Sequence, residues 1–214
     1  MKNFTWPDFY KFTKGRPPWP LLVNAVSFVT HKERALELGS GAGRDTVYLL
    51  EQGFHVTAVD KDPHAIAILA ELPQQNLRLV QSAFEDFQFE RGAYDLVSAQ
   101  FALPFTAKGR FGQVFGQVKD SLRPGGIFVG QLFGVHDEWN TPGSQMTFLT
   151  REQAEELLKD MRVIEFNEED VDGHVANGAP KHWHAFHIIA QKRLKNGKSS
   201  RANVPGKGAA WTNH

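Results

Sequence analysis

The fold of this chain is decided by the stretch Leu36-Glu37-Leu38-Gly39-Ser40-Gly41-Ala42-Gly43-Arg44-Asp45. Residues 34–38 are largely apolar and predict a buried strand, and residues 44–52 have the pattern of a helix. Between them stand glycines at alternate positions. Because glycine has no Cβ, the chain can turn tightly there and approach a bound molecule closely, beside the free N–H groups of the helix N-terminus. The stretch predicts a ligand-binding turn, and a plain tight connection is the alternative.

Two residues of this stretch distinguish between cofactors. A dinucleotide-binding turn has a third glycine three positions after its second, but here Arg44 stands there, where a long side chain would disturb the contact between helix and strand. Glu37, two residues before the first glycine, would repel a pyrophosphate but suits a ligand that carries an ammonium group and a sulfonium. The turn therefore favours S-adenosylmethionine over NAD.

The same residues resemble the first motif of class I S-adenosylmethionine-dependent methyltransferases, an acidic residue followed by Gly-x-Gly-x-Gly. The resemblance implies that cofactor contacts come from Glu37, Gly39, Ser40, Gly41, Gly43 and Arg44. Arg44 can face the methionine carboxylate of the cofactor or pair with a neighbouring acid. The resemblance extends over residues 34–192.

The amino-acid composition limits the classes of protein to which this chain can belong. The chain has 214 residues, 41% of them hydrophobic, with 24 basic and 24 acidic residues, so no global charge points to nucleic acid or to an anionic membrane. Cysteine is absent, which excludes disulfides and thiolate metal sites, and no apolar run approaches the roughly 20 residues of a membrane span. We therefore expect a cytoplasmic protein that acts on a small molecule, without nucleic-acid or membrane partners; its oligomeric state cannot be read from the sequence.

Strand-like and helix-like segments alternate along the chain, which predicts a doubly wound α/β sheet. The resemblance implies a seven-stranded, mostly parallel, Rossmann-like sheet that ends in an antiparallel strand pair. The expected strands are residues 34–38, 55–59, 77–81, 94–101, 127–133, 163–166 and 184–191, with a polar connection at 168–181. The expected helices are residues 21–31, 44–52, one starting at Asp62-Pro63, 111–122, and one capped by Thr150 and Gln153.

Three parts of the chain are expected. Residues 1–33 form an N-terminal arm and helix that can serve as a lid, residues 34–192 form the cofactor-binding domain, and residues 193–214 form a basic tail without much to bury, hence disordered.

A carboxylate ends the second expected strand. Asp60 follows the apolar residues 56–59 and lies beside the glycine turn, where it can accept hydrogen bonds from both hydroxyls of a ribose. A helix cap is the alternative reading, but Asp62 already supplies one. Lys61, the next residue, is counted with the cofactor contacts.

Two later loops complete the expected cofactor site. In the family that the chain resembles, the loop after the third strand holds the adenine, which implies roles for Ala83, Phe84 and Glu85 (or Asp86). Gln100 and Phe101 follow the fourth strand and are expected near the methionine moiety, where Phe105 can wall the site or simply pack. The Asn/Asp-Pro-Pro-aromatic tetrapeptide of many enzymes that methylate nucleobase or amide nitrogens is absent here.

The acceptor is expected to contact segments outside the repeating pattern, namely residues 9–22, 134–148 and 173–183. Arg16 and Trp19 stand out in a proline-rich arm that can fold over the cofactor or simply cover the surface. His174, His182, His184 and His187 suggest a metal, but no cysteine and no clearly placed carboxylate completes a site, so none is expected.

Residues 39–60 resemble the tellurite-resistance and thiopurine-type branch, which implies a small, soft sulfur or metalloid acceptor. Such a nucleophile needs no general base, and no single residue is predicted to be catalytic. The expected activity is methyl transfer from S-adenosylmethionine to a small molecule. The alternatives are a non-catalytic S-adenosylmethionine-binding or regulatory protein and an NAD(P)-dependent oxidoreductase.

Overall fold

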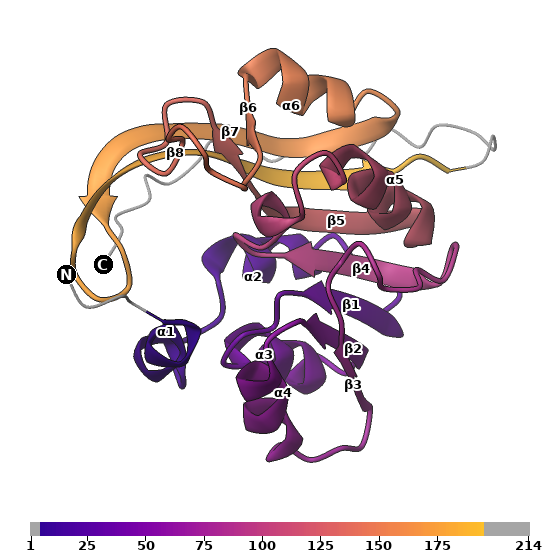
Figure 1. Cartoon of the computed structure of the whole chain (residues 1–214). Helices are drawn as coiled ribbons and strands as arrows, with labels where there is room; N and C mark the ends of the chain where they lie inside the picture. The colour runs from indigo at the N-terminus through magenta and orange to yellow at the C-terminus, as the bar shows by residue number, and fades with distance from the viewer. Residues whose placement is uncertain (1–4, 195–214) are drawn as a thin grey trace.

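The computed structural model describes residues 5–194, so most of the expected tail lies outside the described residues. An eight-stranded sheet runs through the molecule in the order β3-β2-β1-β4-β5-β8-β7, with β6 beside β5 (Figure 1). The strands are β1 Arg34–Leu38, β2 His55–Asp60, β3 Leu77–Gln81, β4 Tyr94–Ala99, β5 Leu122–Gly134, β6 Phe148–Leu149, β7 Met161–His174 and β8 Pro180–Lys192. Strands β1 to β6 pair in parallel, whereas β8 is antiparallel to both β5 and β7.

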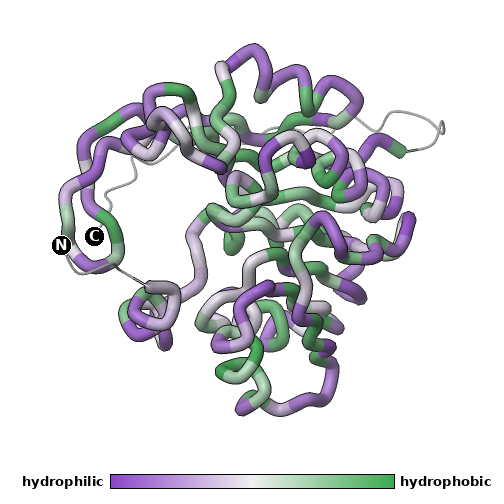
Figure 2. Tube along the Cα trace, viewed as in Figure 1, coloured by the Kyte–Doolittle hydropathy of each residue, from purple (hydrophilic) through white to green (hydrophobic). Residues whose placement is uncertain are grey.

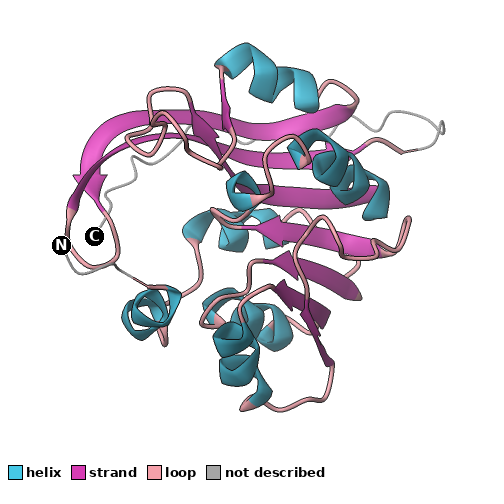
Figure 3. Cartoon of the chain, viewed as in Figure 1, coloured by secondary structure: helices cyan, strands magenta, loops and turns pink. Residues whose placement is uncertain are grey.

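Helices cover both faces of this sheet (Figure 3). They are α1 Trp6–Thr13, α2 Pro20–Val26, α3 Arg44–Glu51, α4 Pro63–Ala70, the short 3-10 helix η1 Leu103–Phe105, α5 Phe111–Ser121 and α6 Arg151–Leu157. One apolar core joins α5 and α6 to the sheet, and a second joins α2, α3 and α4 to its other face. Figure 2 shows hydrophobic residues along the central strands and mostly hydrophilic ones along α6.

The signals at the helix starts are confirmed in detail. Asp62 caps α4 by accepting a hydrogen bond from the His64 N–H, with Pro63 in the first turn. Thr150 and Gln153 exchange hydrogen bonds in the capping box that starts α6. The segment Arg123-Pro124-Gly125-Gly126 interrupts the β4–β5 ladder, because Tyr94 pairs with Leu122 whereas Leu96 pairs with Ile127.

The sequence predicted a polar connection at residues 168–181, and this prediction is wrong. Strands β7 and β8 pair from Met161↔Lys192 to His174↔Pro180, so they form a long hairpin whose turn is only residues 175–179. Acidic residues on β7 face histidines on β8, and these polar cross-strand pairs hold the ladder together where no apolar alternation marks it. The hairpin curves over the edge at which the parallel strands end (Figure 1).

Smaller differences from the expected pattern lie at both ends of the domain. Helix α1 and strand β6 are additional elements, and α2 ends at Val26 instead of residue 31. The sheet has eight strands because β6 joins the expected seven.

Candidate functional site

Packing explains two of the glycines between β1 and α3. Gly39, Gly41 and Gly43 have φ of 76°, 51° and 82°, a region that side chains rarely adopt. A Cβ on Gly39 would lie 2.5 Å from the Cβ of Ala102, and one on Gly43 would lie 2.9 Å from Leu69. These glycines therefore let the turn pack directly against the loop after β4 and against α4.

The middle of the turn is shaped for a ligand. The Gly41 N–H donates to Asp60 Oδ2 at 2.9 Å, and a Cβ on Gly41 would make only an ordinary contact, 3.5 Å, with the Tyr10 ring of α1. The Ser40 hydroxyl beside it is buried and has no hydrogen-bond partner within residues 5–194. A buried hydroxyl without a partner is costly, so a ligand that bonds to it would be favoured here.

Three buried carboxyl groups surround the turn: Glu37 on β1, Asp45 in α3 and Asp60 at the end of β2. Burial raises the pKa of Glu37 well above its usual range, and the neighbouring Asp45 adds to the rise. Burial also raises the pKa of Asp45 to about 6, although it accepts a hydrogen bond from the Trp19 N–H. The pKa of Asp60 is raised for the same reason. A cationic ligand would favour the charged forms of all three, so this cluster is suited to hold positive charge.

Asp60 lies where a ribose-binding carboxylate is expected. Its Oδ1 accepts the Asp62 N–H at 2.9 Å while its Oδ2 accepts the Gly41 N–H, and this fixes the carboxylate between the ends of β1 and β2. Asp62, not Asp60, caps α4. The side chain of Lys61 is exposed.

The loop after β3 lies against the glycine turn. The Phe84 ring would be 3.6 Å from a Cβ on Gly39, and Ala83, Phe84 and Glu85 are half-buried. Glu85 Oε1 accepts the Ala107 N–H at 3.3 Å, which ties this loop to the segment after η1.

A polar network orders the end of β4. Gln131 of β5 donates from Nε2 to Gln100 Oε1 at 3.1 Å, and its Oε1 accepts the Phe101 N–H at 3.0 Å. Phe101 has a φ of 51°, a strained conformation for a residue with a side chain. The structure therefore brings Gln100 and Phe101 to the carboxyl edge of the sheet, beside the glycine turn.

Comparison with known families agrees with this geometry. Residues 35–126 match the model of a family described as a methyltransferase domain. The predicted resemblance to class I methyltransferases is thus confirmed. An uncharacterized methyltransferase of Synechocystis sp. is 33% identical over 97 residues, which are 45% of this chain and 45% of that protein.

A second relative is the probable S-adenosyl-L-methionine-dependent methyltransferase TehB of Haemophilus influenzae, 24% identical over 137 residues, which are 63% of this chain and 48% of that protein. The chain spans about half the length of the curated relatives it matches.

Solved structures confirm the expected fold class. The crystal structure of TehB from Haemophilus influenzae superposes with a TM-score of 0.71 at 21% identity, covering 87% of this chain and 66% of the other. The structure of a Burkholderia thailandensis 1,6-didemethyltoxoflavin-N1-methyltransferase superposes with a TM-score of 0.62 at 23% identity, covering 81% of this chain and 77% of the other. At these identities the likeness shows the fold.

The N-terminal arm is fastened to the rest of the chain at the start of α3. The Trp19 N–H donates to Asp45 Oδ1 at 3.0 Å, and Arg44 donates from Nε to the Pro17 carbonyl at 2.8 Å with its guanidinium 4.4 Å above the Trp19 ring. Arg44 thus holds the arm in this structure, and Arg16 is exposed. Their roles toward cofactor and acceptor stay predictions.

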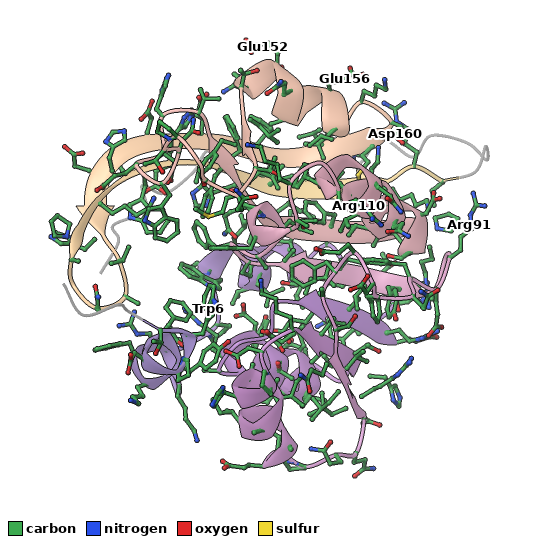
Figure 4. All side chains as sticks on the ribbon, viewed as in Figure 1. Trp6, Arg91, Arg110, Glu152, Glu156 and Asp160 are labelled. Atoms are coloured by element: carbon green, nitrogen blue, oxygen red, sulfur yellow. The ribbon has the colours of Figure 1, made fainter. Side chains whose placement is uncertain are left out.

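Helix α1 covers the glycine turn, which the sequence did not indicate. Tyr10 donates its hydroxyl to Asp62 Oδ2 at 3.1 Å, and the Trp6 ring lies 5.4 Å from that of Phe105 in η1. Figure 4 shows Trp6 at the start of α1. The helix therefore bridges the two sides of the candidate site. Its sequence signals are a proline and an aspartate in the first turn and the i, i+3, i+4 spacing of Trp6, Phe9 and Tyr10.

Aromatic side chains of the hairpin also reach the site and were not singled out from the sequence. The Trp183 ring of β8 lies 5.6 Å from Phe101 and 6.3 Å from Phe133 of β5. Behind it the Lys181 ammonium lies 3.6 Å from the Trp183 ring centre and pairs with Asp137 at 2.6 Å. Burial lowers the pKa of Lys181 despite this carboxylate. The ion pair ties the turn end of the hairpin to the segment that follows β5.

The expectation of no metal is not tested by this structure. His136, Asp170 and His184 have ligand atoms within 4.8 Å of one another. However, His184 Nδ1 accepts the His136 N–H at 3.0 Å, so its proton is on Nε2, which lies 3.0 Å from Glu168 Oε1. A metal at His184 would have to displace one of these hydrogen bonds.

Within residues 5–194, none of the helices has both the length and the apolar character needed to cross a membrane. The cytoplasmic location stays a prediction.

Proposed function

We propose that this protein transfers a methyl group from S-adenosylmethionine to a small-molecule acceptor. The observation that carries the proposal is the cluster of Glu37, Asp45 and Asp60, whose pKa values burial raises around a glycine turn. A ligand with an ammonium group and a sulfonium would offset this cost, whereas a pyrophosphate would add to the repulsion. Two similar proteins support the same cofactor. TehB from Haemophilus influenzae is named a probable S-adenosyl-L-methionine-dependent methyltransferase, and the Burkholderia thailandensis enzyme was crystallised with S-adenosylhomocysteine.

The residues present fit this cofactor. Glu37 would face its ammonium group, Asp60 its ribose hydroxyls, and Ala83, Phe84 and Glu85 its adenine, while the unpartnered Ser40 hydroxyl would gain a hydrogen bond. When bound, the cofactor supplies a methyl group activated by positive sulfur. The tasks left to the chain are to align the acceptor, to exclude water and to place charge. Helix α1 and the arm at residues 14–20 are suited to the second task because they lie across the turn.

The branch resemblance favours a soft sulfur or metalloid acceptor as the narrower expectation. Release of S-adenosylhomocysteine would be assayed with thiols, tellurite, selenite, amines and carboxylates. Cofactor binding without turnover on any acceptor class would instead indicate a non-catalytic S-adenosylmethionine-binding protein.

The proposal is tested most directly by Asp60→Ala. We expect the variant to bind S-adenosylmethionine more weakly by about 1–3 kcal/mol, because the ribose hydroxyls lose a charged acceptor. Calorimetry with S-adenosylmethionine, S-adenosylhomocysteine and NAD measures this directly. Glu51→Ala is the matched control, since it removes an exposed carboxylate at the end of α3, outside the candidate site. Binding of NAD in preference to both sulfur compounds would contradict the proposal, and unchanged affinity in a folded Asp60→Ala would refute the ribose contact.

A further inference from the structure

One face of the β7–β8 hairpin carries aromatic and polar side chains toward the end of β4. Side chains alternate along a strand, so Trp183 and His187 of β8 lie on the same face, opposite to His182 and His184. On this face the Phe101 ring lies 5.6 Å from Trp183, 6.1 Å from His187 and 5.1 Å from Trp19 of the arm. Three segments far apart in sequence thus meet around Phe101.

These rings are partly open to solvent. Trp19, Phe101, Trp183 and His187 are all half-buried, whereas Phe133 behind them is buried. Val171, which pairs with Trp183 across the hairpin, is 45% exposed and extends the apolar surface. Aromatic faces at this spacing recognise another flat ring, because stacked and edge-to-face contacts between rings are favourable beyond the buried area.

A histidine–carboxylate pair lies within this aromatic surface. His187 Nε2 is 2.9 Å from Glu169 Oε2 of β7, and both side chains are about a quarter exposed, 23% and 25%. The carboxylate accepts a hydrogen bond from the Nε2 N–H, which leaves the lone pair of the neutral imidazole on Nδ1. The pair therefore has the arrangement of a base held by an orienting acid.

The pair is joined to the expected methyl-donor position through β5. His187 is the register partner of Gln131, and Gln131 is hydrogen-bonded both to Gln100 and to the Phe101 N–H. The imidazole thus lies one strand away from the residues expected around the methionine moiety. No comparable link joins His182, which lies on the other face with Asp170 and Asp172.

Resting on the methyl transfer proposed above, we propose that the acceptor is a flat aromatic compound that bears a hydroxyl or a ring N–H, and that His187 removes its proton while Glu169 positions the imidazole. The acceptor's oxygen or nitrogen forms a bond to the methyl carbon as the carbon–sulfur bond of S-adenosylmethionine breaks, and the bonding pair stays on sulfur. The acceptor's proton passes to His187 Nδ1 and then to solvent. This acceptor class differs from the soft anion that the branch resemblance favours, which needs no base.

The test uses the full chain and two aromatic acceptors, catechol and thiophenol, the latter at a pH where it is already the thiolate. We expect His187→Gln to lower kcat/KM for catechol about 10²- to 10⁴-fold and for the thiolate only a few-fold, because only catechol needs a base. Glu169→Gln should change the pH profile of catechol methylation and leave that of the thiolate unchanged. His182→Gln is the matched control, being on the same strand and also paired with carboxylates.

Acceptor binding gives a second readout, independent of turnover. With S-adenosylhomocysteine present, catechol should quench the fluorescence of Trp19 and Trp183, and Trp183→Leu should weaken its binding. The inference is overturned if no aromatic compound binds, if aromatic compounds bind without any turnover, if His187→Gln slows both acceptors equally, or if His182→Gln has the same effect. Methylation of tellurite or alkyl thiols without aromatic binding would overturn the inference alone, whereas failure to bind S-adenosylmethionine would overturn the proposed function.

Discussion

At the scale of single residues, the glycine turn joins packing to function. Gly39 touches the loop after β4, Gly43 touches α4, and Gly41 faces α1, so each glycine brings a different element to the candidate site. The turn can therefore be tested separately for stability and for ligand binding.

Gly39→Ala tests the packing role. The new Cβ would lie 2.5 Å from Ala102 at a φ of +76°, so we expect a loss of about 2–4 kcal/mol in the free energy of unfolding, measured in urea. Gly53→Ala is the matched control, since φ there is +90° and nothing lies within 4 Å; it should cost about 1–2 kcal/mol. Adding Ala102→Gly to Gly39→Ala removes the overlapping Cβ, so the double variant should regain the stability that Gly39→Ala loses beyond Gly53→Ala. A double variant no more stable than Gly39→Ala would refute the overlap.

The buried acids predict proton release on cofactor binding. The folded pKa values of Glu37, Asp45 and Asp60 are raised, to about 6 for Asp45, so Asp45 carries a proton in a large fraction of molecules at about pH 6. A cation lowers these pKa values, so affinity for S-adenosylmethionine should rise with pH through about 6 and protons should leave. Calorimetry in buffers of different ionisation enthalpy counts the protons that are released on binding. Glu37→Gln should release fewer, and proton uptake by the wild type would contradict the scheme.

At the scale of elements, the hairpin shows what pattern reading misses. Four of the five residues 168–172 are acidic, which is typical of a solvated loop, but Glu168, Asp170 and Asp172 meet His182 and His184 across the ladder. Helix α1 was missed although Trp6, Phe9 and Tyr10 have the i, i+3, i+4 spacing of one helix face, because the helix has only eight residues and only Tyr10 and Thr13 of them are buried. Both elements are held by contacts with distant segments, which local periodicity does not record.

The polar ladder makes hairpin stability depend on pH. Hydrogen bonds to Asp172 and Asp170 raise the pKa of His182, so its contribution is present below the ordinary histidine value of about 6.5 and is lost as pH rises through the raised value. The pKa of Glu168 is lowered by Arg151 and that of Asp170 by His136, so their contributions are present above about 4 and are lost at lower pH.

Thermal unfolding of His182→Gln should therefore show a lower Tm than the wild type near pH 5.5, and the difference should vanish by about pH 9. His31→Gln, at an exposed position outside the hairpin, serves as control. A difference in Tm that persists unchanged at high pH would show that His182 acts through packing and not through its charge.

At the scale of the whole molecule, the parallel half of the sheet was predictable and the aromatic surface was not. The bounds of β1 and β3 agree with the expected strands, and the carboxyl-edge rule brought Glu37, Asp60, Phe84 and Gln100 to one place, because parallel strands end at a common edge. The meeting of Trp19, Phe101 and Trp183 depends on how the arm and the hairpin curve in three dimensions. Neither curvature has a sequence period, so the sequence indicated residues 9–22 and 173–183 as acceptor segments, whereas the meeting of their aromatic rings around Phe101 emerged only from the structure.

The contrast between the buried parallel strands and the more open arm and hairpin predicts where ligand binding changes the rate of amide hydrogen exchange. In hydrogen exchange without ligand, the buried central strands β1, β4 and β5 should exchange slowest and the hairpin turn at residues 175–179 fastest, since amides open locally where burial is low. S-adenosylhomocysteine should then slow exchange in residues 39–43, 82–87 and 100–105.

The same measurement tests whether the arm is a lid. If it is, protection extends to α1 and to residues 14–20, because Tyr10 and Trp19 are already fastened beside the turn. Helix α6, packed at the other end of the strand order, is the internal reference and should not change. Protection that stops at residue 39 would leave the arm a surface cover, and protection spread equally over α6 would indicate general tightening of the domain instead of a site.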